Sequence, residues 1–257
     1  MKPIISLLKY AVDTCVKIIP RGLFLSALKT LIRSRSRTLK PADSLRFLFT
    51  IEHFLYTLEG GKSVEYGGGV HTKHRHIRYH EFFIDRIGEN ETVLDIGCGI
   101  GAVAASVADA TSAHVTAIDM NGESIDTARR IHNRPNVEYI HGDATKYLPE
   151  GRFDTVILSN VLEHLSGRTA FLETIRTRIA PKRMLVRVPL FERDWRVPLK
   201  KELGLDWRLD STHETEYTLE SFTGEMTSAG FVITHQEVRW GEIWAEAVPQ
   251  HSATPGA

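Results

Sequence analysis

The pattern of apolar and polar positions divides the chain into two regions. In residues 4–19, and again in 24–32, apolar residues recur every three or four positions, which predicts amphipathic helices. Residues 43–58 form a further apolar helical pattern, and the glycine-rich stretch 59–70 predicts a loop. We therefore expect an N-terminal extension of basic amphipathic helices over residues 1–65.

The remainder of the chain alternates between short apolar runs and helical patterns. A helix over 76–87 comes first. The predicted strands are 92–96, 114–119, 136–140, 153–159, 183–188, 231–235 and 239–247, and the predicted helices between them are 102–110, 123–133, 168–179 and 218–229. Strands that alternate with helices predict parallel βαβ units with helices on both faces of one sheet.

The last two predicted strands are separated by residues 236–238 alone. This link is too short for a helical crossover, so these strands must pair antiparallel. We therefore expect a Rossmann-like α/β domain over residues 66–249. Its predicted fold is a doubly wound, seven-stranded, mostly parallel sheet with the last strand antiparallel.

Composition is that of an ordinary soluble domain, but charge is unevenly distributed. The chain is 25% charged and 42% hydrophobic with a net charge of zero, whereas residues 1–46 hold ten Lys/Arg against two Asp. Three interpretations remain open: helices that cap or dimerise the main domain as a homodimer, helices in peripheral contact with an anionic membrane through residues 1–40, or a disordered basic arm.

Cysteine content and hydropathy favour the cytoplasm, with attachment to the inner face of the membrane left open. The two cysteines, Cys15 and Cys98, provide no disulfide framework. No run of 18 apolar residues is present.

The stretch TVLDIGCGIGAV, residues 92–103, follows the first predicted strand of the domain. Gly97 and Gly99 let a ligand approach the backbone, and the helix that begins near Gly101 directs its amide groups at that ligand. Taken loosely, Gly97, Gly99 and Ala102 also match the fingerprint of a dinucleotide-binding loop. The glycines alone therefore leave the ligand open.

One aspartate lies at the tip of each of the first three strands. Asp95, Asp119 and Asp143 follow one another at equal intervals along the chain. The second suits a ribose, and the third suits an exocyclic amino group. Asp95 would repel a pyrophosphate but would attract a sulfonium and an amino group. The diphosphate of a nicotinamide dinucleotide would be repelled by Asp95, whereas a positively charged ligand would not. These acids therefore disfavour a nicotinamide oxidoreductase.

At this point the sequence resembles the class I S-adenosylmethionine-dependent methyltransferases. The motifs that carry the resemblance are VLDIGCGIG, VTAIDMN, HGDAT, FDTVILSNVLEHL and GFVIT, and together they cover roughly residues 75–247. The resemblance implies S-adenosylmethionine as cofactor. It also implies the following cofactor-binding residues: Asp95, Gly97, Cys98 and Gly99 around the methionine moiety, Asp119 on the ribose, Met120 on the adenine, Asp143 and Ala144 at its amino edge, and Asn160 near the methyl donor.

Three residues are candidates for catalysis at the methyl acceptor. His164, in LEHL after the fourth strand, is the candidate base, with Glu163 beside it, and His213 lies in the long segment 189–217 after the fifth strand. A histidine after the fourth strand also commonly packs or caps a helix. The residues after Ser159 lack the Asn/Asp-Pro-Pro-aromatic motif of nucleobase methyltransferases, which argues against DNA adenine methylation.

Two segments are candidates for binding the acceptor. His71, Arg75 and Tyr79 precede the first strand, where this family commonly folds a segment over the cofactor; an exposed basic helix is the alternative. Trp195 and Trp207 lie in segment 189–217, whose length is typical of a lid or acceptor-binding insertion. These tryptophans would stack on a ring or sugar, or would close a small satellite core.

Metal and nucleic-acid sites are not predicted. His76 and His80 could share a helix face, but no carboxylate or cysteine pattern accompanies them, so we expect no metal. Basic residues in 189–217 are matched by acidic ones, which is unlike a nucleic-acid groove.

The sequence thus predicts a methyltransferase that acts on a small-molecule or lipid- or glycan-linked acceptor, most often at oxygen. The candidate base His164 and the missing nucleobase motif favour oxygen. The alternatives are a binding or scaffold protein of this fold without turnover, and a protein or RNA methyltransferase.

Overall fold

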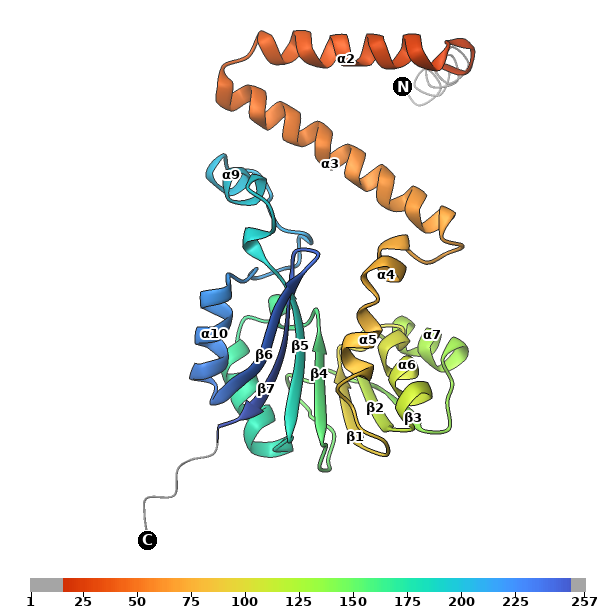
Figure 1. Cartoon of the computed structure of the whole chain (residues 1–257), viewed down its shortest axis with the longest axis vertical. Coiled ribbons are helices and arrows are strands. Elements are labelled where there is room, and N and C mark those ends of the chain that lie inside the picture. The colour runs from red at the N-terminus through yellow and green to blue at the C-terminus, as the bar shows by residue number, and fades with distance from the viewer. Residues whose placement is uncertain (1–15, 251–257) are drawn as a thin grey trace. The chain divides into compact units, whose positions relative to one another are not determined.

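The computed structural model describes residues 16–250, so the predicted helix over 4–19 lies almost wholly outside the described residues. The chain divides between Lys62 and Ser63 into two compact units. The N-terminal unit consists of helix α2, Arg21–Arg37, and most of helix α3, Pro41–Tyr66 (Figure 1). None of the described helices is long and apolar enough to cross a membrane.

Helix α3 is longer than predicted, so the expectation of a loop over 59–70 is wrong for residues 59–66. Gly60 and Gly61 each disfavour a helix by about 1 kcal/mol relative to alanine, and the helix tolerates both. It ends instead at Gly68 and Gly69, where φ is positive and the Gly69 amide donates to the Val64 carbonyl at 2.9 Å. A left-handed glycine is a common helix terminator.

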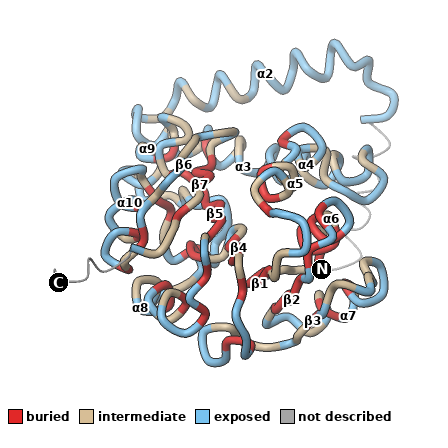
Figure 2. Tube along the Cα trace, turned by 60° about the horizontal axis from the view of Figure 1, so that its bottom comes forward, coloured by how far each residue is buried: buried red, intermediate tan, exposed pale blue. Residues whose placement is uncertain are grey.

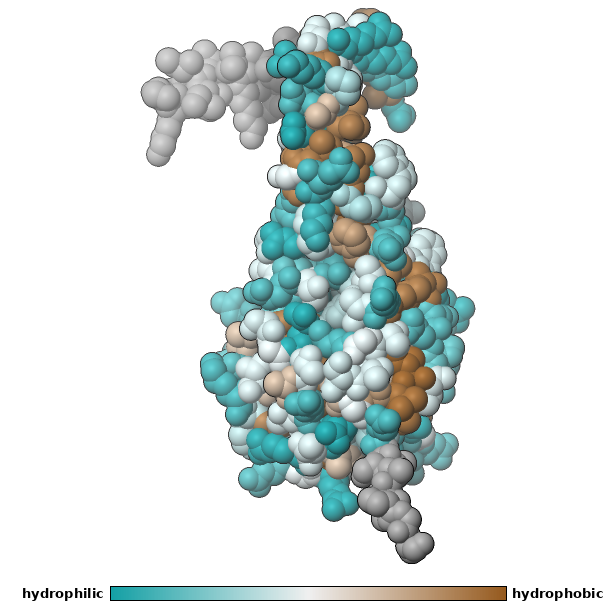
Figure 3. All heavy atoms as spheres, turned by 90° about the vertical axis from the view of Figure 1, so that its left-hand side faces the viewer, coloured by the Kyte–Doolittle hydropathy of each residue, from teal (hydrophilic) through white to brown (hydrophobic). Residues whose placement is uncertain are grey.

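Both helices of the N-terminal unit carry apolar side chains on their surfaces (Figure 3). No residue of α2 is buried, and Leu31 and Phe54 are 68% and 61% exposed. The same part of the chain carries the basic residues Lys29, Arg33, Arg35 and Arg37.

The C-terminal unit contains the predicted sheet, in the order β3-β2-β1-β4-β5-β7-β6 (Figure 1). Its strands are β1 Thr92–Ile96, β2 His114–Asp119, β3 Val137–His141, β4 Thr155–Ser159, β5 Arg183–Pro189, β6 Phe231–Arg239 and β7 Glu242–Pro249. β1 to β5 pair parallel, and β7 pairs antiparallel with both β5 and β6. The seven-stranded, mostly parallel fold is confirmed.

The helices lie on both faces of this sheet, and each face of the sheet has its own apolar core. They are α4 Thr72–Ile77, α5 Tyr79–Ile84, α6 Ala102–Thr111, α7 Gly122–Ile131, α8 Arg168–Thr174 with the π-helix η2 Ile175–Ile179, and α10 Leu219–Ser228. Phe83, Val107 and Trp244 belong to one core, and Leu158 and Phe222 belong to the other. Buried residues follow the strands between these layers (Figure 2).

Two boundaries differ from the prediction. The expected helix over 76–87 is divided into α4 and α5 at Arg78, which adopts the left-handed conformation with φ 51°. The closing hairpin turns at Trp240 and Gly241, both with positive φ, and not at 236–238. Residues 236–238 pair instead with β7, because the two-residue turn lets both strands continue to it.

The insertion between β5 and α10 returns to the sheet edge from which it starts. It contains the short helices η3 Phe191–Arg193 and α9 Arg196–Glu202. The Phe191 amide donates to the Tyr217 carbonyl at 2.7 Å, and the Tyr217 amide donates to the Pro189 carbonyl at 3.2 Å. These bonds hold both ends of the insertion at the carboxyl end of β5, next to the neighbouring strand β4.

Candidate functional site

The glycine loop after β1 presents bare backbone at the carboxyl edge of the sheet. Gly97, Gly99 and Gly101 have φ of 71°, 54° and 79°. A Cβ at Gly97 would lie 2.5 Å from the Val161 side chain, and one at Gly101 would lie 2.6 Å from the Tyr139 ring. A Cβ at Gly99 would meet nothing within 4 Å. Two glycines are thus required by packing, and the third faces open space that a ligand can fill.

Asp95 is a buried carboxylate beneath this loop. It is 1% exposed, and its Oδ2 has no hydrogen-bond partner among residues 16–250. Burial, with a smaller contribution from the neighbouring Asp119, raises its pKa to about 7, and the Ala104 amide of α6 opposes the rise. Burial likewise raises the pKa of the half-buried Cys98 thiol. An unpartnered carboxyl oxygen fits a ligand that brings a positive or donating group.

Asp119 ends β2 and ties the glycine loop to the next strand. Its two oxygens accept hydrogen bonds from the Gly99 amide at 2.7 Å and from the Asn121 amide at 2.8 Å. The following residue, Met120, is 73% exposed, so its side chain is free to pack on a ring. Each carboxylate oxygen retains capacity for a further donor, such as a ribose hydroxyl.

Asp143 and Ala144 follow β3 at the same edge. Asp143 accepts from the Thr145 amide at 3.0 Å and from its hydroxyl at 2.6 Å, and pairs with Lys146 at 2.9 Å. These hydrogen bonds lower the pKa of Asp143 to about 2. The carboxylate therefore begins a turn and stays ionised, which is compatible with accepting from an amino group.

The tip of β4 passes next to the glycine loop. Asn160 adopts a left-handed conformation with φ 57°, and its amide donates to the Arg187 carbonyl at 2.8 Å. Val161 touches Gly97, as described above. This turn leads into the 3-10 helix η1, Leu162–His164, and so carries Glu163 and His164 to the neighbourhood of the loop.

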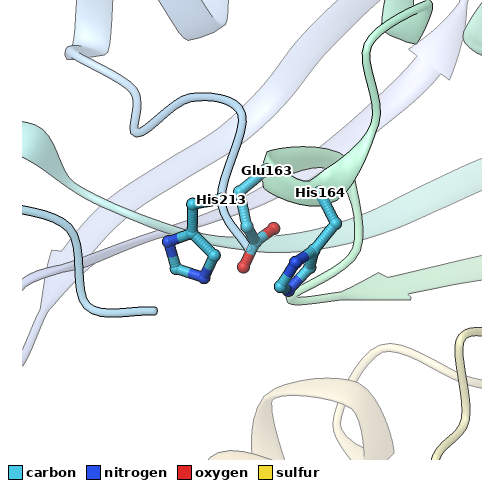
Figure 4. Close-up of side chains that lie close together, drawn as sticks. All are labelled: Glu163, His164 and His213. Atoms are coloured by element: carbon cyan, nitrogen blue, oxygen red, sulfur yellow. The ribbon is translucent and has the colours of Figure 1, made fainter. Parts of the chain in front are cut away.

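Glu163, His164 and His213 gather into one cluster (Figure 4). One ligand-type atom of each lies within 4.8 Å of those of the other two. The Glu163 carbonyl accepts from the amides of Glu214, at 2.7 Å, and Thr215, at 3.2 Å, which holds the β5–α10 insertion against η1. The sequence named all three residues, and the structure brings them together.

The three side chains differ in their electrostatic environment. Glu163 is fully buried, and burial raises its pKa to about 8. Burial and the neighbouring His213 lower the pKa of His164, so its imidazole is neutral near pH 7. The His213 Nδ1 lies 3.0 Å from the Glu216 carboxylate.

Glu216 and the ion pair of Arg187 and Glu242 were not predicted from the sequence. Glu216 is buried, pairs with Arg193, and accepts from the Leu209 amide at 2.5 Å. Arg187 and Glu242 form a two-point ion pair, with both N–O distances 2.7 Å, across β5 and β7. The spacing of His213 and Glu216, three residues apart, is the one sequence signal that could have indicated a supporting pair.

The candidate residues before β1 divide into three environments. The His71 side chain caps α4 by accepting from the Lys73 amide at 3.1 Å. Arg75 is exposed. Tyr79 is half-buried with the Arg187 guanidinium 4.7 Å from its ring centre, and burial raises its pKa, with Asp95 adding to the rise. Tyr79 is therefore the one of the three near the glycine loop.

The two tryptophans of the insertion also differ. Trp195 is 68% exposed, whereas the Trp207 ring packs edge-on against Phe191 with their centres 5.0 Å apart. Lys201 lies over the same ring at 5.0 Å. Trp207 thus belongs to a small satellite core, and Trp195 remains available for contact with a ligand.

The glycine loop, the three strand-tip aspartates and the sheet with its antiparallel β7 define the class I S-adenosylmethionine-dependent methyltransferases. Residues 70–236, more than half of the chain, match the model of a family described as a methyltransferase domain. The chain belongs to this family, whose methyl donor is S-adenosylmethionine.

Known proteins of related sequence and fold support this assignment. A ubiquinone biosynthesis O-methyltransferase from Paraburkholderia xenovorans is 34% identical over 95 residues, 35% of this chain and 40% of that protein. An (S)-tetrahydroprotoberberine N-methyltransferase from Eschscholzia californica is 28% identical over 104 residues, 38% of this chain and 30% of that protein. The matches therefore span less than half of either relative.

A solved structure shares the fold. A magnesium protoporphyrin IX methyltransferase from Synechocystis, crystallised with bound SAH, has a TM-score of 0.54 and 18% identity. The likeness covers 68% of this chain and 84% of that one.

Proposed function

We propose that the protein transfers a methyl group from S-adenosylmethionine to an oxygen of a small-molecule or lipid- or glycan-linked acceptor. The observation that carries this proposal is the cluster of Glu163, His164 and His213 beside the glycine loop. Acceptor hydroxyls must lose a proton during methylation, and this cluster supplies the neutral imidazole of His164 for that purpose.

The cofactor is held, in this proposal, by the residues at the carboxyl edge of the sheet. The unpartnered oxygen of Asp95 takes its amino group, Asp119 takes the ribose, and the exposed Met120 covers the adenine. Asp143 and Ala144 hold the adenine amino edge. When bound, S-adenosylmethionine supplies a methyl carbon on a positively charged sulfur, which leaves as a neutral thioether once the acceptor oxygen bonds to that carbon.

The acceptor lies between the cluster and the β5–α10 insertion. Trp195 offers an exposed ring for stacking, and Tyr79 closes the side next to Asp95. The main contribution of these residues is alignment, because an in-line displacement depends on the position of the acceptor oxygen. Proton removal at the cluster supplies the remaining rate gain.

Calorimetric titration with S-adenosylhomocysteine, with NADH as a parallel control, tests the cofactor. We expect saturable micromolar binding of S-adenosylhomocysteine alone. Binding of NADH alone would contradict the methyltransferase function.

A screen of hydroxyl and amine acceptors then tests the acceptor atom, followed by the variant His164→Ala. We expect hydroxyl acceptors to be methylated and turnover to fall by about 10²–10⁴-fold in His164→Ala. The matched control is His114→Ala, which removes an exposed histidine at the start of β2. Unchanged turnover in His164→Ala would exclude the cluster from proton removal.

The N-terminal unit supports a lipid-linked acceptor at an anionic membrane surface. Exposed apolar residues on α2 and α3 accompany Arg33, Arg35 and Arg37, a combination suited to the boundary between headgroups and acyl chains. We expect the chain to float with anionic vesicles and not with neutral ones. The full-length variant with Arg33, Arg35 and Arg37 replaced by Glu should stay unbound; equal flotation of both proteins would remove the membrane from the proposal.

A further inference from the structure

Glu163, His164 and His213 offer two imidazoles and one carboxylate to a common point. They come from two segments, η1 and the β5–α10 insertion, that are distant in sequence but tied by the Glu163 carbonyl. The three ligand-type atoms lie within 4.8 Å of one another, and the Glu163 carboxylate lies between the two rings in Figure 4. The centre of such a triangle is at most about 2.8 Å from each atom, and metal–ligand bonds of about 2.1 Å are within a small side-chain adjustment.

The Glu163 carboxyl group lacks the partners that a buried acid ordinarily has. Its side chain is 0% exposed, and neither oxygen accepts or donates a hydrogen bond among residues 16–250. Leaving a carboxyl group buried and unpartnered is unfavourable, and a cation is the partner that removes the penalty most directly. Of the unpartnered buried side-chain atoms in that part of the chain, Glu163 alone contributes both oxygens of one carboxyl group.

The Nδ1 atom of each histidine has a hydrogen-bond acceptor beside it. The Glu216 carboxylate lies 3.0 Å from the His213 Nδ1 and, being an acceptor only, receives a hydrogen from it. The Thr212 hydroxyl donates to Asp210 at 2.8 Å, so at 3.0 Å it accepts from the His164 Nδ1. Each ring then carries its lone pair on Nε2.

This arrangement is the one that supports metal-binding histidines. A carboxylate or other acceptor that holds the second ring nitrogen fixes the tautomer and makes the imidazole a better ligand. Each imidazole then has an Nε2 lone pair available in the same cluster as the Glu163 carboxyl group.

We propose that Glu163, His164 and His213 bind a divalent transition metal ion. Imidazole nitrogens favour ions such as Zn²⁺, and the carboxylate also suits Mn²⁺, whereas Mg²⁺ and Ca²⁺ prefer oxygen ligands throughout. Three protein ligands leave at least one coordination position open, as in catalytic and not structural metal sites. The absence of a recognisable metal motif in the sequence is explained by the separation of His213 from the other two ligands.

The ion deepens the function proposed above and, in this respect, rests on it. The acceptor hydroxyl oxygen occupies the open position, and the positive charge lowers the pKa of that hydroxyl so that its proton leaves to solvent near neutral pH. The ion is neither oxidised nor reduced. With the ion bound, His164 acts as a ligand and not as the free base described under the proposed function, and Glu216 and Thr212 are positioning residues.

Metal titration of the full-length protein tests this inference without an acceptor. Protein freed of metal by a chelator is titrated with Mn²⁺, followed by electron paramagnetic resonance of the free ion, and with Zn²⁺ by calorimetry. We expect one ion per chain, with binding weakened roughly 100-fold or more in Glu163→Gln and His213→Gln. Glu216→Gln should weaken binding by about 10–100-fold, since it loosens a ligand without removing one.

The control is His76→Ala, which removes an exposed histidine outside the cluster and should bind the ion like the wild type. Binding of S-adenosylhomocysteine, together with circular dichroism, shows whether each variant is folded. Wild-type protein that binds S-adenosylhomocysteine but neither ion would overturn the metal site and leave the proposed function standing. Equal metal binding by wild type and both ligand variants would also overturn it. Metal binding without S-adenosylhomocysteine binding would instead reject the proposed function.

Discussion

Replacement of Asp95 by Asn tests the buried carboxylate beneath the glycine loop. Its pKa rises from an ordinary 3.8 to about 7 in the folded protein, chiefly because it is buried. A group whose folded pKa is raised contributes stability that is fully present below the unfolded pKa and is lost as pH rises through the folded one. The interval corresponds to about 4 kcal/mol.

The expected result is a difference in the shape of two pH profiles. Between pH 4 and pH 8 the wild type should lose about 4 kcal/mol more free energy of unfolding than Asp95→Asn, which carries no titrating group at this position. Urea unfolding at half-unit pH steps measures both profiles. Subtracting the pH profile of Asp95→Asn from that of the wild type cancels the contributions of the other titrating groups to the free energy of unfolding. Asp126→Asn, which changes an exposed aspartate of α7, should follow the wild type throughout.

The same variant separates stability from ligand binding. If Asp95 holds the amino group of the cofactor, a proton competes with the ligand below pH 7. Wild-type affinity for S-adenosylhomocysteine should then be roughly tenfold or more weaker at pH 5.5 than at pH 8. Asp95→Asn should bind weakly at both pH values. Parallel unfolding profiles would refute the raised pKa, and unchanged affinity in Asp95→Asn would refute the assignment to the cofactor.

Two further changes follow from packing. Gly97→Ala should lose about 1–3 kcal/mol of stability by urea unfolding, because its Cβ meets Val161. Gly99→Ala should lose less stability and still weaken S-adenosylhomocysteine binding. Equal stability losses in the two variants would contradict the open space at Gly99. Arg187→Met should lower the free energy of unfolding by about 3–5 kcal/mol, because it leaves Glu242 buried and unpaired. Replacing both Arg187 and Glu242 by Met should recover most of this loss, measured by thermal unfolding. No recovery would show that packing, and not the unpaired charge, determines the loss.

The centre of the sheet was predictable because β1, β4 and β5 are almost wholly buried. Parallel strands covered on both faces give continuous apolar runs, such as Thr92–Ile96, which are separated by clear helical patterns. Boundaries set by single residues were less predictable. The break at Arg78 depends on a left-handed conformation that a non-glycine residue seldom adopts. The hairpin turn was predicted too early, at 236–238, because the actual turn depends on Trp240, another non-glycine residue with positive φ.

The sequence was sufficient to select the candidate residues of the site, whose roles stay predictions, but not their arrangement. Spacing at strand tips was sufficient to select Asp95, Asp119 and Asp143, because the carboxyl ends of parallel strands meet at one edge. The residues and hydrogen bonds that hold the cluster together could not be predicted from such spacing. Glu216 acts on His213 through a local turn, and His213 reaches Glu163 only through the hydrogen bonds of the insertion, for which no periodic pattern exists.

The joined ends of the β5–α10 insertion have a consequence for evolution and engineering. Since the Phe191–Tyr217 and Tyr217–Pro189 hydrogen bonds close the insertion at its base, its length can change with little effect on the sheet. Doubling the length of a flexible closed loop costs only about 0.6 kcal/mol in closure entropy. In the proposed function this insertion binds the acceptor, so exchanging it between relatives, with His213 and Glu216 inside the exchanged segment, should transfer acceptor preference as one unit.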